Sequence, residues 1–278
     1  MLHFAKAGRR IGAAEVADAD RAARGAVRDL KRMARPSGHF DASRYFRGDH
    51  NLGFYNVGTG AMRALARSIW AAHSGTPRSQ FPIRNQSAMR WGIEHAMAFA
   101  DLLIVNRYLE VKVVAIEVVA RYHRAFTPAL LGRWKRWLAG NHSANWATTD
   151  AICGELVGPL LVQYPRLAAE MRAWSKHPNM WVRRASIVGL LPLARKGQAL
   201  DLLYEIAARL HKDTEDLIQK AVGWALREAG KPDVVRLERY LRANGPSIPR
   251  TTLRYAIERF PPGKRRTLLV ATKARTKD

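Results

Sequence analysis

Residues 145–150 have the sequence NWATTD, and the chemistry open to their one acidic residue is the first question. Asp150 follows Trp146 by four residues, so the two side chains share a face if this segment is helical. The chain around them is strongly basic, with 47 Lys and Arg residues against 23 Asp and Glu and a formal net charge of +24. Such a surplus fits a partner with dense negative charge, most often nucleic acid. Because a carboxylate repels phosphate, Asp150 needs a chemical role at such a site.

The role that suits Asp150 is stabilisation of a developing cation. In nucleic acid, that cation is the oxocarbenium sugar formed when an N-glycosidic bond breaks. A carboxylate stabilises such a sugar and orients the attacking water, as in sugar hydrolysis generally. Aromatic faces pack on sugars or bases, and guanidinium groups hold phosphates. The candidate catalytic residues are Asp150, Trp146, Trp224 and Arg184, and the candidate DNA-binding residues are Arg227, Lys220, Arg183 and Arg63.

Helices must position these residues, because apolar side chains recur at i, i+3 and i+4 along the chain and strand patterns are scarce. Proline and glycine punctuate the segments between the helical patterns. Amphipathic helices are predicted at 110–122, 217–228 and 252–260. The sequence therefore predicts an all-α protein.

The helices also repeat, with a period of 35 or 36 residues. A small residue followed by Ile or Val occurs at Ala115-Ile116, Ala151-Ile152, Ser186-Ile187, Ala221-Val222 and Ala256-Ile257. Two helices in a unit of this length indicate an α-solenoid, and the missing W…LG…Y pattern favours HEAT-like over tetratricopeptide repeats. We expect a HEAT-like α-solenoid of antiparallel helix pairs, whose inner helices line a concave basic groove.

The helical phase separates the core of each repeat from this groove. At about 100° per residue, the small residues and their apolar neighbours define a core stripe. Trp146 and Asp150 fall outside it, as do Arg184 and Trp224 in the next two repeats, so we expect them to meet in the groove. Simpler explanations stay open, because a tryptophan at helical spacing is often a core residue and one of the adjacent Arg183 and Arg184 is normally solvated.

A capping role is the simpler explanation for Asp150. A helix that begins at residues 148–150 would place this carboxylate at its N-cap. Asn141 or Ser143 supplies a good N-cap earlier, and such a start keeps Trp146 inside the helix. We therefore favour an earlier cap and a groove position for Asp150.

Composition and motifs bound the remaining classes. With 278 residues, 47% hydrophobic and 25% charged, the chain is a folded globular protein with one cysteine, Cys153, and hence no internal disulfide. No HExxH, Walker or GxGxxG pattern is present, so no metal or cofactor is expected. Signal-peptide and membrane-spanning patterns are also missing, which favours a cytoplasmic protein, expected to be a monomer. We expect a single domain, with an N-terminal capping helix and loop at 1–44 and a HEAT-like repeat domain at 45–278.

Several segments resemble a known family. NWATTD, WVRRASI and LIQKAVGWALRE, the last followed by KPDVV, are similar to the HEAT-repeat alkylpurine DNA glycosylases of bacteria, the AlkD-like DNA alkylation repair proteins. The resemblance runs from about Tyr45 to about Leu269 and is most specific at GWALRE and W-x-x-x-D. The segment FYNVGTGAMRALA departs from the family with Asn56 where Gly is usual and Gly60 where Pro is usual. Asn145 stands where an aromatic residue can precede the tryptophan of W-x-x-x-D.

The resemblance implies hydrolytic removal of N3- or N7-alkylated purines from duplex DNA, without metal or cofactor. Asp150 matches the catalytic carboxylate, Trp146 and Trp224 match the aromatics that cradle the lesion's deoxyribose, and Arg184 matches the residue that holds nearby backbone. Similar members leave the base stacked, whereas most glycosylases extrude it. The alternatives are a non-catalytic HEAT-repeat nucleic-acid-binding protein and a protein-binding HEAT scaffold. The presence of Asp150 together with Arg184 argues against the non-catalytic protein. The net charge of +24 argues against the protein-binding scaffold.

Overall fold

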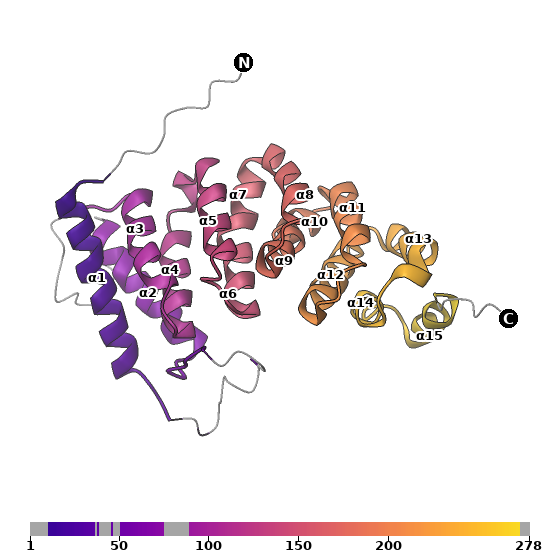
Figure 1. The fold of residues 1–278 in the computed structure, drawn as a ribbon, viewed down its shortest axis with the longest axis horizontal. Helices are drawn as coiled ribbons and strands as arrows, with labels where there is room; N and C mark the ends of the chain where they lie inside the picture. Colours follow the sequence, from indigo (N-terminus) through magenta and orange to yellow (C-terminus); the bar gives the residue numbers. More distant parts are fainter. Residues whose placement is uncertain (1–10, 37, 39–45, 47–50, 75–88, 273–278) are drawn as a thin grey trace, which may run out of the picture. The chain divides into compact units, whose positions relative to one another are not determined.

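The structure is a computed structural model that describes residues 11–36, 38, 46, 51–74 and 89–272. All regular secondary structure in these residues is helical (Figure 1), which confirms the all-α prediction. None of the helices in the described ranges is both long and apolar enough to cross a bilayer. The chain divides into two compact units, Met1–Leu156 and Val157–Asp278, each treated by itself below. The boundary predicted between residues 44 and 45 lies outside the described residues.

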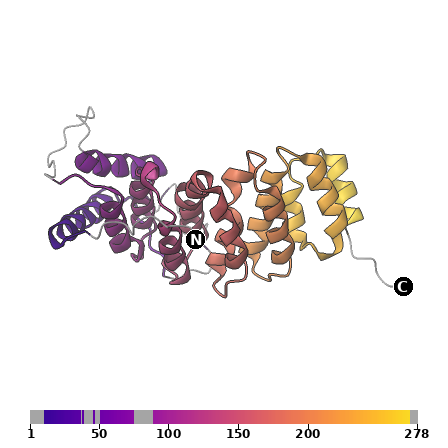
Figure 2. The ribbon, with the colours of Figure 1, turned by 90° about the horizontal axis from the view of Figure 1, so that it is seen from above.

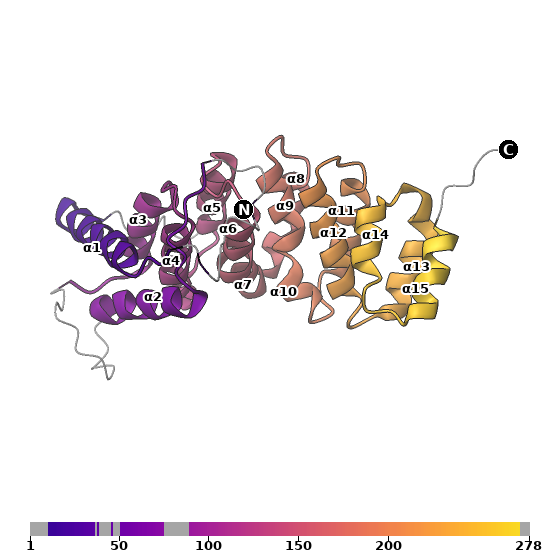
Figure 3. The same ribbon diagram turned by 90° about the horizontal axis from the view of Figure 1, so that it is seen from below.

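The first unit is built around one central helix. Its helices are α1 (Ala13–Arg32), α2 (Thr59–Ser74), α3 (Ile93–Ile104), α4 (Leu109–Ala120), α5 (Ala129–Ala139) and α6 (Trp146–Ala151). Helix α4 packs against α1, α2, α3 and α6, and α3 lies between α1 and α4 (Figure 3). Because neighbours surround α4, most of its side chains are buried, charged ones included. The helix predicted at 110–122 corresponds to α4, which ends two residues earlier.

A buried carboxylate on α4 organises the turn before α2. Glu110 Oε1 accepts hydrogen bonds from the backbone amides of Tyr55, at 3.0 Å, and Val57, at 3.3 Å. The two amides converge because Asn56, between them, is left-handed at φ 56°, a geometry that forms an anion-binding nest. Glycine adopts this conformation most easily and asparagine is among the few alternatives, so Asn56 can occupy a position where the resemblance leads us to expect glycine. The side-chain Nδ2 of Asn56 also donates a hydrogen bond to the Arg35 carbonyl at 3.2 Å.

The second unit stacks helices in two rows. Its helices are α7 (Gly158–Gln163), α8 (Met171–Trp174), α9 (Met180–Val188), α10 (Leu191–Ala194), α11 (Leu200–Leu210), α12 (Asp216–Ala229), α13 (Val234–Asn244), α14 (Arg250–Ala256) and α15 (Pro262–Ala271). Helix α12 packs against α9 on one side and α14 on the other, and these three form the lower row of this unit in Figure 1. Helices α11 and α13 pack on α12 from the second row, and Figure 2 shows the stack from above. We call helices α9, α12 and α14 the α9–α12–α14 row.

The small–aliphatic pairs from which the repeat was predicted are almost all buried. Nine of these ten residues are buried: Ala115, Ile116, Ile152, Ser186, Ile187, Ala221, Val222, Ala256 and Ile257. The exception, Ala151, is half-exposed and directly precedes a π-helical segment, Ile152–Val157. A π-turn is wider than an α-turn, so the phase counted at 3.6 residues per turn shifts there.

One helix boundary predicted from the sequence was wrong. The pattern at 252–260 predicts a helix to Phe260, but α14 ends at Ala256 and the following residues form turns. Two prolines follow directly, Pro261 and Pro262. A proline disfavours helical geometry in the residue before it, so the apolar spacing continues after the helix has ended.

Candidate functional site

Helix α6 begins because of Asn145. Its Oδ1 accepts from the Thr148 amide at 2.8 Å, and its Nδ2 donates to the Ser143 carbonyl at 2.7 Å and to Thr148 Oγ1 at 3.0 Å. The N-cap predicted at Asn141 or Ser143 was therefore wrong. Asn141 is left-handed at φ 59°, not extended as an N-cap requires, and the buried Ser143 hydroxyl makes no hydrogen bond in the described structure. Asn145, which departs from the family pattern, thus has a clear local function.

Trp146 is the first residue of α6 and lies half-buried at its start. Its indole stacks on the Phe46 ring, with ring centroids 5.3 Å apart and planes inclined by 14°. Phe46 in turn contacts Phe54, at 5.4 Å between centroids. Neither phenylalanine was predicted as part of the site. Phe46 lies about a hundred residues from Trp146, and helical periodicity carries no information over such a separation.

Asp150 lies one turn after Trp146 and is partly exposed, whereas Thr148 and Thr149 between them are fully buried. The two buried threonines fix which side of α6 faces the core, so Trp146 and Asp150 share its outer edge. Asp150 is near the end of α6 and Asn145 caps the start. The capping explanation for Asp150 is therefore wrong.

An ion cluster follows on the π-helical segment. Arg63 of α2 holds Glu117 of α4 by a 2.9 Å bond from Nε to Oε1, and its Nη2 lies 4.0 Å from Glu155. Burial raises the pKa of Glu155, as does the negative charge of Glu117, while Arg63 and Arg121 act in the opposite direction. The hydrogen bond with Glu117 raises the pKa of Arg63. Arg63, a candidate for DNA contact, is thus shared between two carboxylates.

In the second unit, Arg184 is not a solvated surface residue. Its side chain is 95% buried on α9, and Nη1 donates to the Leu217 carbonyl in the first turn of α12. The guanidinium therefore ties two neighbouring helices of the α9–α12–α14 row together. Sequence spacing placed Arg184 outside the core stripe but did not reveal this tie.

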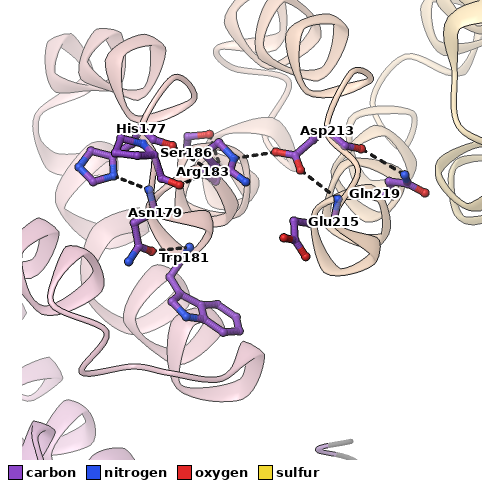
Figure 4. Close-up of polar contacts among 9 residues, drawn as sticks. His177, Asn179, Trp181, Arg183, Ser186, Asp213, Glu215 and Gln219 are labelled. Carbon is purple, nitrogen blue, oxygen red and sulfur yellow. Dashed lines mark hydrogen bonds and ion pairs between the residues drawn. The ribbon is translucent and has the colours of Figure 1, made fainter. Parts of the chain in front are cut away.

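Arg183, its neighbour, also has internal partners (Figure 4). Its Nε donates to Asp213 at 2.7 Å, and its Nη1 donates to the carbonyls of Pro178 at 2.6 Å and His177 at 3.1 Å. These bonds join the loop before α9 to the loop before α12. Neither arginine of the pair is simply solvated, contrary to the simpler explanation.

The exposed side of α12 carries three of the candidate residues. Lys220, Trp224 and Arg227 are spaced i, i+4 and i+7, and all three are partly exposed while the intervening residues are buried. Lys220 Nζ lies 2.6 Å from Asp216, and Arg227 forms an ion pair with Glu258 in the turn that follows α14. We call Lys220, Trp224 and Arg227 the α12 stripe.

Arg184 and the α12 stripe are close in space. The hydrogen bond with Asp216 raises the pKa of Lys220, and the positive charge of Arg184 lowers it. The structure thus gathers Arg184, Lys220, Trp224 and Arg227 on adjoining helices of the second unit, and Trp146 with Asp150 on one helix of the first. Within the described ranges, no three His, Cys, Asp or Glu side chains are grouped as a metal site.

Comparisons with known proteins agree with this fold. The model of the DNA alkylation repair enzyme family matches residues 26–260, most of the chain. A solved structure described as a predicted DNA alkylation repair enzyme from Enterococcus faecalis is similar, with a TM-score of 0.67 and 18% sequence identity, over 82% of this chain and 98% of that chain. At this identity, the structural likeness shows the shared fold alone. A search of the curated proteins gave no match.

Proposed function

Because the chain belongs to the family of DNA alkylation repair enzymes, we propose that it is a DNA glycosylase that hydrolyses the N-glycosidic bond of N3- and N7-alkylated purines in duplex DNA. The observation that carries the proposal is the pairing of Trp146 with Asp150 on the outer edge of α6. Family membership makes DNA repair the role, and this pair supplies groups suited to a sugar cation. The proposed products are a free alkylpurine and an abasic site.

The proposed reaction needs one carboxylate and one water molecule. The bond between C1′ and the purine nitrogen breaks, and its electron pair neutralises the positive charge that alkylation placed on the base. The sugar becomes an oxocarbenium ion, which the negative charge of Asp150 stabilises. Water then bonds to C1′ and passes a proton to the carboxylate, as in other sugar hydrolyses. Alkylation already makes the purine a good leaving group, so the step uses no separate acid.

The other candidate residues have binding roles in this proposal. Trp146 and Trp224 pack on the deoxyribose of the lesion, which keeps water from the cation except where it attacks. Arg184 holds the backbone next to the lesion, and its tie to α12 keeps the guanidinium beside the α12 stripe.

Phosphate contacts are proposed for three cations, Arg63, Lys220 and Arg227. Each has a carboxylate partner in the free protein, which a phosphate must replace. Arg183 was also predicted to contact DNA, and its three internal hydrogen bonds support a structural contribution to the same surface.

The test is base release from duplex DNA treated with a methylating agent. We expect 3-methyladenine or 7-methylguanine to appear in the supernatant while the strand stays intact until heat or alkali cleaves the abasic site. Unmethylated duplex of the same sequence is the control. Binding of methylated duplex without release of either base would instead identify a non-catalytic nucleic-acid-binding protein.

A further inference from the structure

We propose that Tyr255 and Arg254 of α14 bind the DNA strand that flanks the lesion, about one helix spacing away from Trp224. The inference rests on the proposed function, because it assumes that DNA lies along the exposed side of the α9–α12–α14 row. It adds a binding surface in the next repeat and names the ligand chemistry as the sugar–phosphate backbone of one strand.

Helix α14 is held at a fixed position against α12. A Cβ atom on Gly223 would lie only 2.5 Å from the Thr252 carbonyl oxygen and 2.5 Å from Tyr255 Cβ, so the glycine permits this close approach. Thr252 Oγ1 also donates to the Gln219 carbonyl at 2.9 Å. The backbone that carries Tyr255 is therefore seated directly on α12.

The exposed sides of α12 and α14 are in register. Tyr255 is close enough to Lys220 to influence its pKa, although the Asp216 hydrogen bond dominates the rise. In the turn that follows α14, Glu258 pairs with Arg227. Lys220 and Arg227 are the two ends of the α12 stripe, so Trp224 and Tyr255 border the same surface.

The exposed chemistry of α14 suits a nucleic-acid strand. Tyr255 is an aromatic side chain with 38% exposure, and Arg254 beside it is also exposed. Aromatic rings pack on sugars or bases, and guanidinium groups bind phosphates. Charge complementarity extends beyond these two residues, since residues 250–271 contain a single acid, Glu258, against Arg250, Arg254, Arg259, Lys264, Arg265 and Arg266.

The spacing sets where on the strand the contact falls. Packed helices lie about 8–10 Å apart, and a strand of duplex DNA advances about 3.4 Å per nucleotide. The contact is therefore expected about three nucleotides from the lesion, on one side of it only.

The experiment measures Kd by fluorescence anisotropy on duplexes that carry a tetrahydrofuran abasic analogue, with either arm shortened one nucleotide at a time. For the unchanged protein, affinity should fall about tenfold when one arm becomes shorter than about three nucleotides. Tyr255→Ala should bind long duplexes about tenfold more weakly and show no step for that arm, while Tyr255→Phe should retain the step. Tyr164→Ala is the matched control, because Tyr164 is 37% exposed in the same unit.

Two results would overturn this inference. One is that the Tyr255→Ala variant shows the same fall in affinity, at the same arm length, as the unchanged protein. The other is an equal loss on every duplex together with a lower Tm, which indicates a structural role. This experiment measures DNA binding and not base release. A protein that binds DNA without excising bases would therefore still show the dependence on arm length, while the separate base-release assay would contradict the proposed function.

Discussion

At the scale of single residues, Asn145 decides which way the side chains of α6 face. Its amide caps the helix and is itself buried, so the first helical residue is Trp146. The buried Thr148 and Thr149 then turn Asp150 to the outer edge. A carboxylate and an aromatic ring one turn apart on such an edge can approach the same sugar.

Replacing the site tryptophans should separate activity from stability. Trp146 and Trp224 are half-buried, so Trp146→Ala and Trp224→Ala should cost clearly less than the roughly 3–5 kcal/mol typical of a fully buried Trp, while base release falls strongly. Trp134→Ala and Trp174→Ala are the controls in the first and second unit, because both of these side chains are buried in the core. Chemical denaturation and base release are measured on all four. A loss of stability at a site tryptophan as large as in its control would place that ring in the core.

The residue-scale features differ in how far sequence could predict them. The half-exposed position of Trp224 followed from the helical phase, because that phase was counted from the buried Ala221 on the same regular helix, whereas Ala151, the reference for Trp146, is itself half-exposed. The stacking of Phe46 on Trp146 and the cap at Asn145 could not be predicted this way. The first depends on a contact between distant segments, and the second on a turn whose left-handed residues are not glycines.

At the scale of elements, side-chain ties between neighbouring repeats recur at one interval, slightly shorter than the predicted period of 35 or 36 residues. Among the described residues, four ties join positions 33 apart: Arg172 with Glu205, Arg195 with Glu228, Arg184 with the Leu217 carbonyl, and Thr252 with the Gln219 carbonyl. Each repeat contacts its neighbours in a similar way, so the interval between tied residues recurs. The sequence predicted the period, but the side chains that carry the ties depend on rotamers and reach that periodicity does not encode.

The close approach of α12 and α14 predicts a cost for Gly223→Ala. Alanine normally favours a helix over glycine by about 1 kcal/mol, but here its Cβ would meet backbone and side-chain atoms of α14 at 2.5 Å. We expect a net loss of about 1–3 kcal/mol, the range for overpacking. Gly132→Ala on α5 is the control, since within the described structure nothing lies within 4 Å of its added methyl, and it should be stabilising. Urea denaturation compares the two; stabilisation by Gly223→Ala would show that α14 moves away freely.

A buried carboxylate between α12 and its neighbours predicts a pH dependence. Burial by itself raises the pKa of Glu228, but hydrogen bonds from Lys231 and Arg195 lower it overall. The folded-state pKa of Glu228 thus lies below the unfolded value of about 4.3. The ionised carboxylate therefore stabilises the folded state above that pH, and this stabilisation is lost as the pH falls through the folded-state pKa.

Glu228→Gln should therefore destabilise the protein by about 1–2 kcal/mol at pH 7, because the hydrogen bonds from the partly exposed Arg195 and Lys231 lose their charged acceptor. The difference from the unchanged protein should shrink below about pH 4.3. Urea denaturation at several pH values measures it. A difference that stays constant down to pH 3 would mean that the charge of Glu228 contributes nothing.

At the scale of the whole molecule, the net charge of +24 predicts salt-dependent binding of duplex DNA. The affinity for duplex DNA should fall by about tenfold or more between low and physiological salt, because cationic side chains that bind phosphates release counterions from the DNA. Lys220→Ala and Arg227→Ala should each reduce the slope of log K against log salt by up to about 0.9, alike for damaged and intact duplexes. Their ion pairs with Asp216 and Glu258 will diminish the effect.

Arg209→Ala, at an exposed position on α11 outside the α9–α12–α14 row, removes the same charge and should leave the slope unchanged. Fluorescence anisotropy at four or five salt concentrations gives all the slopes. Equal reductions in all three variants would show that the protein attracts DNA by net charge alone, without the α12 stripe.

The central claim concerns Asp150, and single-turnover base release from N7-methylguanine duplex tests it most directly. Asp150→Asn keeps the shape of the side chain and removes the charge that stabilises the oxocarbenium ion. It should bind the duplex at least as tightly as the unchanged protein, because one repulsion with phosphate is lost, and release the base on the order of 10²–10³ more slowly. Glu205→Gln, which removes a charge of the same sign on α11, should match the unchanged protein in both measurements. Equal rates of release by the unchanged protein and Asp150→Asn would contradict the account.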